Sequence, residues 1–128
     1  MTRLVLAGLL LAACGGDDGG GGGTADAPMV DASANKVVGV TCPSTPDAEI
    51  TISSGGGAYM PMATMVPVNA VVRFTMTATH DAKPNTLTTT DPGLVVGFGE
   101  TKCLKFTATG TFGFFCSAHS FAGTVTVN

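Results

Sequence analysis

The sequence has no tryptophan, one tyrosine, two histidines and little charge, since only 12% of its 128 residues are Asp, Glu, Lys or Arg. From residue 36 onward five basic residues are balanced by five acidic ones. The folded part is therefore about neutral, and we expect no nucleic-acid partner. Good helix formers are scarce beyond the first residues, whereas threonine and valine are common, and this composition favours an all-β domain.

The first 35 residues differ from the rest. Arg3 is followed by an apolar run over 4–11 that is too short to cross a bilayer, which is typical of a signal peptide. The run ends in Leu11-Ala12-Ala13-Cys14, which resembles a bacterial lipobox. We therefore expect residues 1–13 to be removed and Cys14 to carry lipid. The protein would be exported and anchored to a bacterial membrane, facing the periplasm or the exterior. An ordinary secretory signal with an incidental Cys14 is the alternative.

Residues 14–35 form the second segment. It is rich in glycine and aspartate and cannot bury enough apolar surface to offset the entropy of ordering, so we expect a flexible linker. From residue 36 to 128, short apolar runs separated by turn residues predict a β-sandwich domain. Prolines confine residues 59–68 to edges, bulges or loops. Strands are expected at 36–40, 49–52, 70–80, 86–90 and 102–107, and in a hairpin from 110 to 127.

Two stretches of this domain carry candidate metal ligands. In the 70–80 strand, alternation places His80 in the buried phase at the strand end. In the terminal hairpin, Phe112, Phe114 and Cys116 share one face, and His119 follows in a C-x-x-H pattern. One thiolate and two imidazoles in an apolar β-sandwich form a trigonal donor set that suits copper.

The end of the chain is similar to the C-terminal signature of the cupredoxins, the blue-copper family. The matching residues are Gly110-Thr111-Phe112, Phe114, Cys116, His119 and Gly123-Thr124-Val125-Thr126-Val127. The resemblance covers about residues 36–128. It implies a Greek-key β-sandwich of about 7–8 strands holding one copper ion. It also implies an electron carrier rather than an enzyme, a monomer that meets a redox partner protein transiently.

The chain departs from the family where relatives place a methionine after the second histidine, because Ala122 stands there. The axial position would then be empty, be filled by the carbonyl of Thr79, or be filled by a methionine from elsewhere. Phe121 would cap the site with apolar bulk. Weak axial donation should disfavour Cu(II) and raise the reduction potential. The methionines in question are Met60, Met62 and Met65.

The four cysteines divide among these roles. With Cys14 assigned to lipid and Cys116 to metal, Cys42 and Cys103 remain for a disulfide in an exported protein. A bridge between Cys103 and Cys116 is the alternative, and it would abolish the metal site. The lack of the usual methionine also leaves a second function open, a module that handles copper or serves structure without metal.

Overall fold

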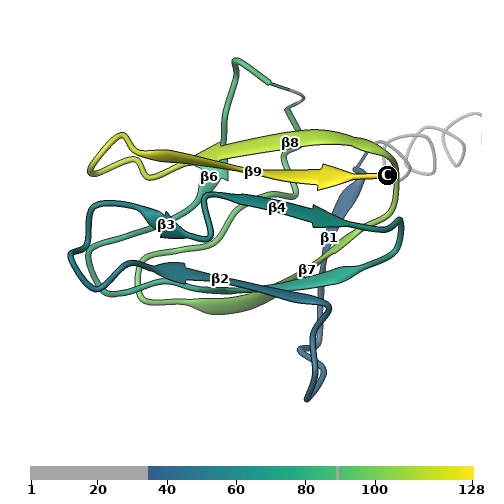
Figure 1. Ribbon diagram of the computed structural model, residues 1–128, viewed down its shortest axis with the longest axis horizontal. Coiled ribbons are helices and arrows are strands. Elements are labelled where there is room, and N and C mark those ends of the chain that lie inside the picture. The colour runs from purple at the N-terminus through teal and green to yellow at the C-terminus, as the bar shows by residue number, and fades with distance from the viewer. Residues whose placement is uncertain (1–34, 89) are drawn as a thin grey trace, which may run out of the picture. The chain divides into compact units, whose positions relative to one another are not determined.

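The computed structural model describes residues 35–88 and 90–128 of the chain. The predicted signal peptide, Cys14 and all of the predicted linker except Asn35 lie outside these residues. The described residues contain nine strands in two sheets, and in Figure 1 the two sheets lie one above the other. This arrangement confirms the all-β sandwich. The count is slightly above the expected 7–8, and two of the strands, β3 and β6, have only two residues each. In the part that the structure describes, no helix is long and apolar enough to cross a membrane.

One sheet has five strands in the order β1-β7-β5-β2-β3. Its strands pair antiparallel except for β2 and β5, which run parallel. The central strand is β5, because it pairs with β7 on one side and with β2 on the other. The strands are β1 (Val37–Val40), β2 (Ala48–Ile52), β3 (Tyr59–Met60), β5 (Val71–Thr75) and β7 (Thr101–Phe106).

The other sheet has four strands in the order β4-β9-β8-β6. The hairpin of β8 and β9 is antiparallel, and β4 runs parallel to β9. The turn between β8 and β9 lies at the left end of Figure 1, and the C-terminus lies at the opposite end. The strands are β4 (Ala63–Val66), β6 (Lys83–Pro84), β8 (Gly110–Phe115) and β9 (Ala122–Val127).

Two predicted strands need correction. The strand expected at 70–80 ends at Thr75, because the backbone then turns: Thr77 O accepts hydrogen bonds from His80 N at 3.0 Å and from Gly99 N at 2.8 Å. His80 is therefore on a turn, although it is buried as expected. The strand expected at 86–90 is absent from its described residues, which form a turn held by the hydrogen bond from Leu87 N to Asn85 Oδ1.

Aromatic side chains fill the space between the sheets. Phe74 packs edge-on against Phe114 with ring centroids 5.3 Å apart, and Phe106 packs against Phe112 at 5.4 Å. All four rings are fully buried. Each fully buried phenylalanine contributes on the order of 2–3 kcal/mol to folding. This core makes the inner face of β8 rigid up to the point where Cys116 follows it.

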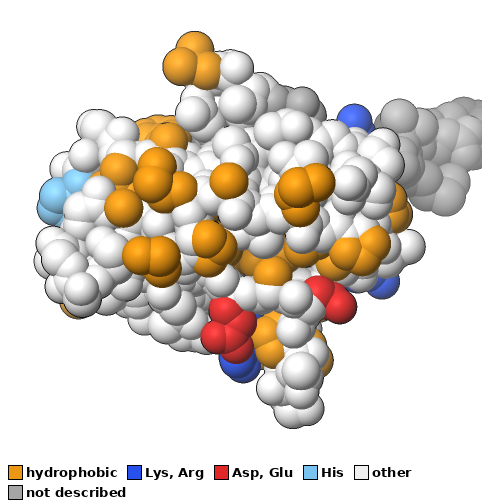
Figure 2. All heavy atoms as spheres, viewed as in Figure 1, with side chains coloured by type: hydrophobic (Ala, Val, Ile, Leu, Met, Phe, Trp, Pro, Cys, Tyr) orange, Lys and Arg blue, Asp and Glu red, His pale blue; other side chains and the backbone are white. Residues whose placement is uncertain are grey.

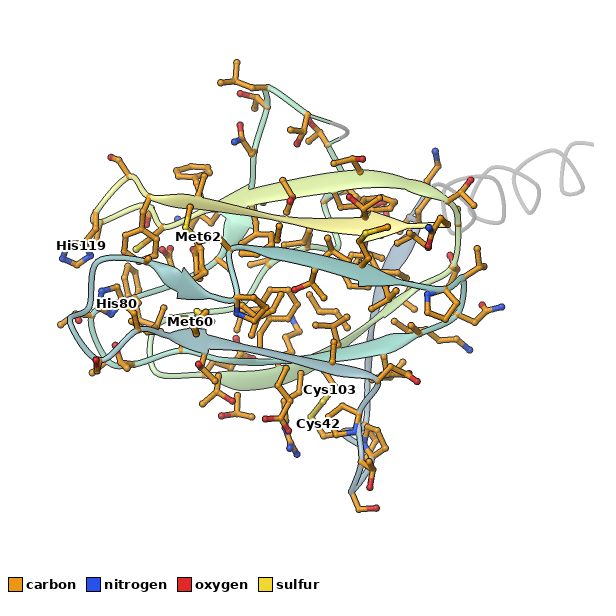
Figure 3. All side chains as sticks on the ribbon, viewed as in Figure 1. Cys42, Met60, Met62, His80, Cys103 and His119 are labelled. Atoms are coloured by element: carbon orange, nitrogen blue, oxygen red, sulfur yellow. A yellow bond between two sulfur atoms is a disulfide. The ribbon has the colours of Figure 1, made fainter. Side chains whose placement is uncertain are left out.

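A disulfide joins Cys42 to Cys103, with an S–S distance of 2.05 Å. Cys103 is on β7, and its neighbour across the pairing is Val40 on β1. Figure 3 shows this bridge well away from the end of the sandwich that carries His80 and His119. The expected pairing is thus present, and Cys116 is the free cysteine of the described residues.

Candidate metal centre

His80 reaches the end of the sandwich from the turn that follows β5. Its ring is almost fully buried. Nε2 lies 2.9 Å from the carbonyl oxygen of Gly56, and Nδ1 lies 2.5 Å from Thr77 Oγ1 and 3.1 Å from Thr79 Oγ1. A carbonyl oxygen can only accept a hydrogen bond, so Nε2 carries the proton in the neutral ring. We therefore assign Nδ1 as the nitrogen with a free electron pair.

Cys116 and His119 come from the loop between β8 and β9. Cys116 is completely buried, because it directly follows β8 and lies two residues after Phe114, on the same face as Phe112 and Phe114. The loop is closed by hydrogen bonds from Cys116 N to Phe121 O and from Ser120 N to Cys116 O, both 2.9 Å. These bonds turn the chain back so that His119 Nδ1 lies 3.7 Å from Cys116 Sγ.

The two histidines face each other across the two loops. Their ring centroids are 4.6 Å apart with an interplanar angle of 31°. His80 is buried whereas His119 is exposed, and Figure 3 shows His119 at the outer end of the sandwich. The structure thus places His119 close to both Cys116 and His80, which come from two separate segments of the chain.

The donor chemistry fits a soft metal ion. Metal–sulfur and metal–imidazole bonds of about 2.3 and 2.0 Å together exceed the distance between Cys116 Sγ and His119 Nδ1, so one ion can contact both atoms. Within residues 35–88 and 90–128, however, no three His, Cys, Asp or Glu side chains form a complete metal-binding group. His80 is the adjacent donor, but both its ring nitrogens are engaged in hydrogen bonds.

Asp81 joins the turn that carries His80 to the loop between β8 and β9. The sequence did not point to this residue. Its carboxylate accepts hydrogen bonds from Ser117 N at 2.7 Å and from Ser117 Oγ at 2.6 Å. Burial would raise the pKa of Asp81, but the hydrogen bonds from Ser117 and Cys116 and the charge of Lys83 outweigh it and lower that pKa below its ordinary value. The only signal in the sequence was its position, since it directly follows His80.

Tyr59, the single tyrosine, supports the same loop from inside. Its hydroxyl donates a 2.6 Å hydrogen bond to the backbone carbonyl of Asp81. Burial, together with negative charge at Cys116 and Asp81, raises the pKa of Tyr59 far above its usual range. Tyr59 therefore stays protonated and keeps donating this hydrogen bond.

Phe121, the last residue of the loop between β8 and β9, packs near Tyr59 and both histidines. Its ring centroid lies 4.7 Å from that of Tyr59, 5.5 Å from that of His80 and 6.2 Å from that of His119. The role of Phe121 as an apolar cap on a metal ion stays a prediction. Ala122, which begins β9, is exposed and its methyl group offers no donor atom.

The remaining axial candidates are placed as follows. Thr79 approaches His80 with its hydroxyl, at 3.1 Å from Nδ1. The methionines of β3, of the segment between β3 and β4, and of β4 are exposed, with relative exposures of 58%, 59% and 71% in that order. These methionines are therefore mostly exposed, unlike the buried His80 and Cys116. These residues are Met60, Met62 and Met65.

Solved structures share this fold at low sequence identity. The Cu(I) form of an amicyanin variant is 18% identical, covering 73% of this chain and 100% of its own, with a TM-score of 0.59. An amicyanin from Paracoccus versutus is 13% identical, covering 73% and 99%, with a TM-score of 0.55. A pseudoazurin from Sinorhizobium meliloti is 13% identical, covering 63% and 72%, with a TM-score of 0.53.

No curated protein matches the sequence. A family model described as copper binding proteins, plastocyanin/azurin family, matches residues 45–128. This match spans more than half of the chain and includes every residue of the candidate site. The chain therefore belongs to the plastocyanin/azurin family of copper-binding proteins, and its cofactor is copper.

Proposed function

We propose that this protein is a type 1 copper protein that carries single electrons at the bacterial cell envelope. In this proposal His80, Cys116 and His119 hold the copper ion, without a methionine from the loop between β8 and β9, which we call the ligand loop. The observation that carries the proposal is the approach of His119 Nδ1 to the buried sulfur of Cys116, at 3.7 Å, with the His80 ring against that of His119.

The bound ion would supply one-electron chemistry by changing between Cu(I) and Cu(II). The protein's part is to hold the donors in one arrangement for both states. Cys116 is fixed by the rigid aromatic face of β8, and Asp81 ties the His80 turn to the ligand loop through Ser117. Donors held in this way need to move little when the electron arrives or leaves.

His119 is the proposed route for the electron, because it is the exposed member of the three. Figure 2 shows a histidine at the surface of one end of the molecule, while the charged side chains on this face lie elsewhere. Its neighbours in the loop are small or apolar: Ser117, Ala118, Ser120 and Phe121. Such a surface allows a redox partner protein to approach closely and leave again quickly.

The cellular setting is proposed from the sequence. The apolar run and Cys14 support export and a lipid anchor, and both lie outside the described residues. The disulfide between Cys42 and Cys103 is consistent with export, since such bonds persist in oxidising compartments. The protein would act as a monomer tethered through its linker.

The absorption spectrum of the purified domain, titrated with Cu(II), tests the ligand set. We expect an intense visible band from charge transfer between the Cys116 thiolate and copper. Cys116→Ser should lose this band completely, and His119→Ala should weaken or shift it. Far-UV circular dichroism of each variant checks that the sandwich is intact. A wild-type protein that bound copper without the visible band would refute the proposed site.

A second function is supported by the hydrogen bonds of His80. Because Thr77 and Gly56 engage both ring nitrogens, and Ala122 offers no donor, the domain could bind copper for handling or serve structure without it. The same titration separates the two functions. Tight Cu(I) binding without a visible Cu(II) band would favour copper handling, and no binding would favour the structural module.

A further inference from the structure

His80 is held by a short turn in which a threonine precedes it by three residues. Thr77 O accepts the backbone hydrogen bond from His80 N, and the Thr77 hydroxyl reaches the ring of the same histidine. On the other side the ring is fixed by Gly56 O, which faces Nε2. Since Gly56 O requires the proton on Nε2, Nδ1 is an acceptor and the Thr77 hydroxyl is its donor.

An imidazole nitrogen of this kind has one electron pair and serves one close partner at a time. A metal ion on Nδ1 would lie about 2.0 Å from it, whereas Thr77 Oγ1 already lies at 2.5 Å. The ion and the hydroxyl therefore compete for the same electron pair. We propose that Thr77 sets the metal affinity of the site by competing with copper for His80 Nδ1.

The surroundings allow the hydroxyl to give way. Thr77 is exposed, so its side chain can rotate into solvent. Its carbonyl stays bonded to His80 N and Gly99 N, which holds the backbone of the turn in place. Thr79 Oγ1, at 3.1 Å from Nδ1, is a longer and weaker contact that serves as an internal control.

This inference rests on the proposed copper site, and it adds a residue that is not among the three proposed ligands. The test compares the domain with Thr77→Val, Thr77→Ser and Thr79→Val. Valine has the shape of threonine without the hydroxyl, and serine keeps the hydroxyl. Affinities for Cu(I) and Cu(II) are measured by competition with chelators. The metal-free proteins are compared by ¹⁵N NMR of the histidine rings.

We expect Thr77→Val to bind both Cu(I) and Cu(II) more tightly, by roughly two- to tenfold, which is the range of one net hydrogen bond. The reduction potential should not change, because both oxidation states gain equally. Thr77→Ser should resemble wild type, and Thr79→Val should change affinity less than Thr77→Val. In the metal-free protein, only the Nδ1 resonance of His80 should move in Thr77→Val.

Two results would overturn the inference while leaving the copper site intact. One is a Thr77→Val protein with unchanged affinities. The other is a selective loss of Cu(II) affinity with a raised potential, which would make the Thr77 hydroxyl an oxygen ligand instead of a competitor. A wild-type protein that bound no copper would refute the proposed function, and this inference with it.

Discussion

Replacing Asp81 with alanine should lower the free energy of unfolding of the metal-free domain by more than a typical substitution of an exposed residue does. The carboxylate is 1% exposed and accepts two hydrogen bonds from Ser117, at 2.6 and 2.7 Å. Hydrogen bonds to a charged group contribute about 1.5–3 kcal/mol each. Because Ser117 is exposed, water can replace part of this loss. We therefore expect a loss of about 2–4 kcal/mol in the free energy of unfolding.

Urea unfolding at neutral pH, followed by circular dichroism, measures this quantity through the midpoint and slope. In thermal unfolding, the same loss should lower Tm by about 10–20 °C for a domain of this size. Asp81→Asn keeps an acceptor for Ser117 N and should lose about half as much. Asp47→Ala is the matched control: its carboxylate accepts a 2.8 Å hydrogen bond from Val71 N, but the residue is exposed and the loss should stay below about 1 kcal/mol.

The pH dependence follows from the lowered pKa of Asp81. A carboxylate whose pKa is lower in the folded state stabilises the protein above its unfolded pKa of about 3.9. This contribution disappears as the pH falls through the folded pKa. The stability difference between wild type and Asp81→Asn should therefore shrink in strongly acid solution. A difference below about 1 kcal/mol between wild type and Asp81→Ala at neutral pH would refute the view that Asp81 holds the two loops together.

Two further predictions concern stability. Thr64→Val should stabilise the domain by about 1 kcal/mol, because Thr64 Oγ1 is buried without a hydrogen-bond partner among the described residues. A urea unfolding midpoint equal to or lower than that of the wild type would contradict this prediction. Replacing Cys42 and Cys103 together with serine should cost about 4 kcal/mol, since their bridge closes a loop with a sequence separation of 61 residues; a thermal unfolding curve that did not shift would contradict this.

The sequence predicted the fold through local patterns. Alternation along β5 and β8 identified buried faces correctly, since in a strand neighbouring side chains point to opposite sides of the sheet. The pattern overextended the strand that leads to His80. Threonines at 77 and 79 continue the alternation in polarity, but the backbone hydrogen bonds to Thr77 O turn the chain there. An alternating sequence predicts which side chains are buried, but it does not predict the residue at which the hydrogen bonds between neighbouring strands end.

The sequence predicted the candidate donor residues of the site but did not predict the residues that hold them in place. Cys116 and His119 are three residues apart, so a local motif revealed them. Asp81 and Tyr59 support the site through contacts between segments that are far apart in sequence. A buried carboxylate and a buried tyrosine have no spacing rule of their own, and only the folded chain shows what they contact.

The sequence by itself thus determined the class of fold, the copper-binding family and the identity of the candidate donors. Each of these depends on short patterns whose physical meaning is local. The tertiary structure decided that Asp81 joins the His80 turn to the loop between β8 and β9, that the Phe121 ring packs near both histidine rings, and that the Thr77 hydroxyl contacts Nδ1 of His80. These features depend on the distances between side chains from separate strands and turns, and packing of the two sheets sets those distances.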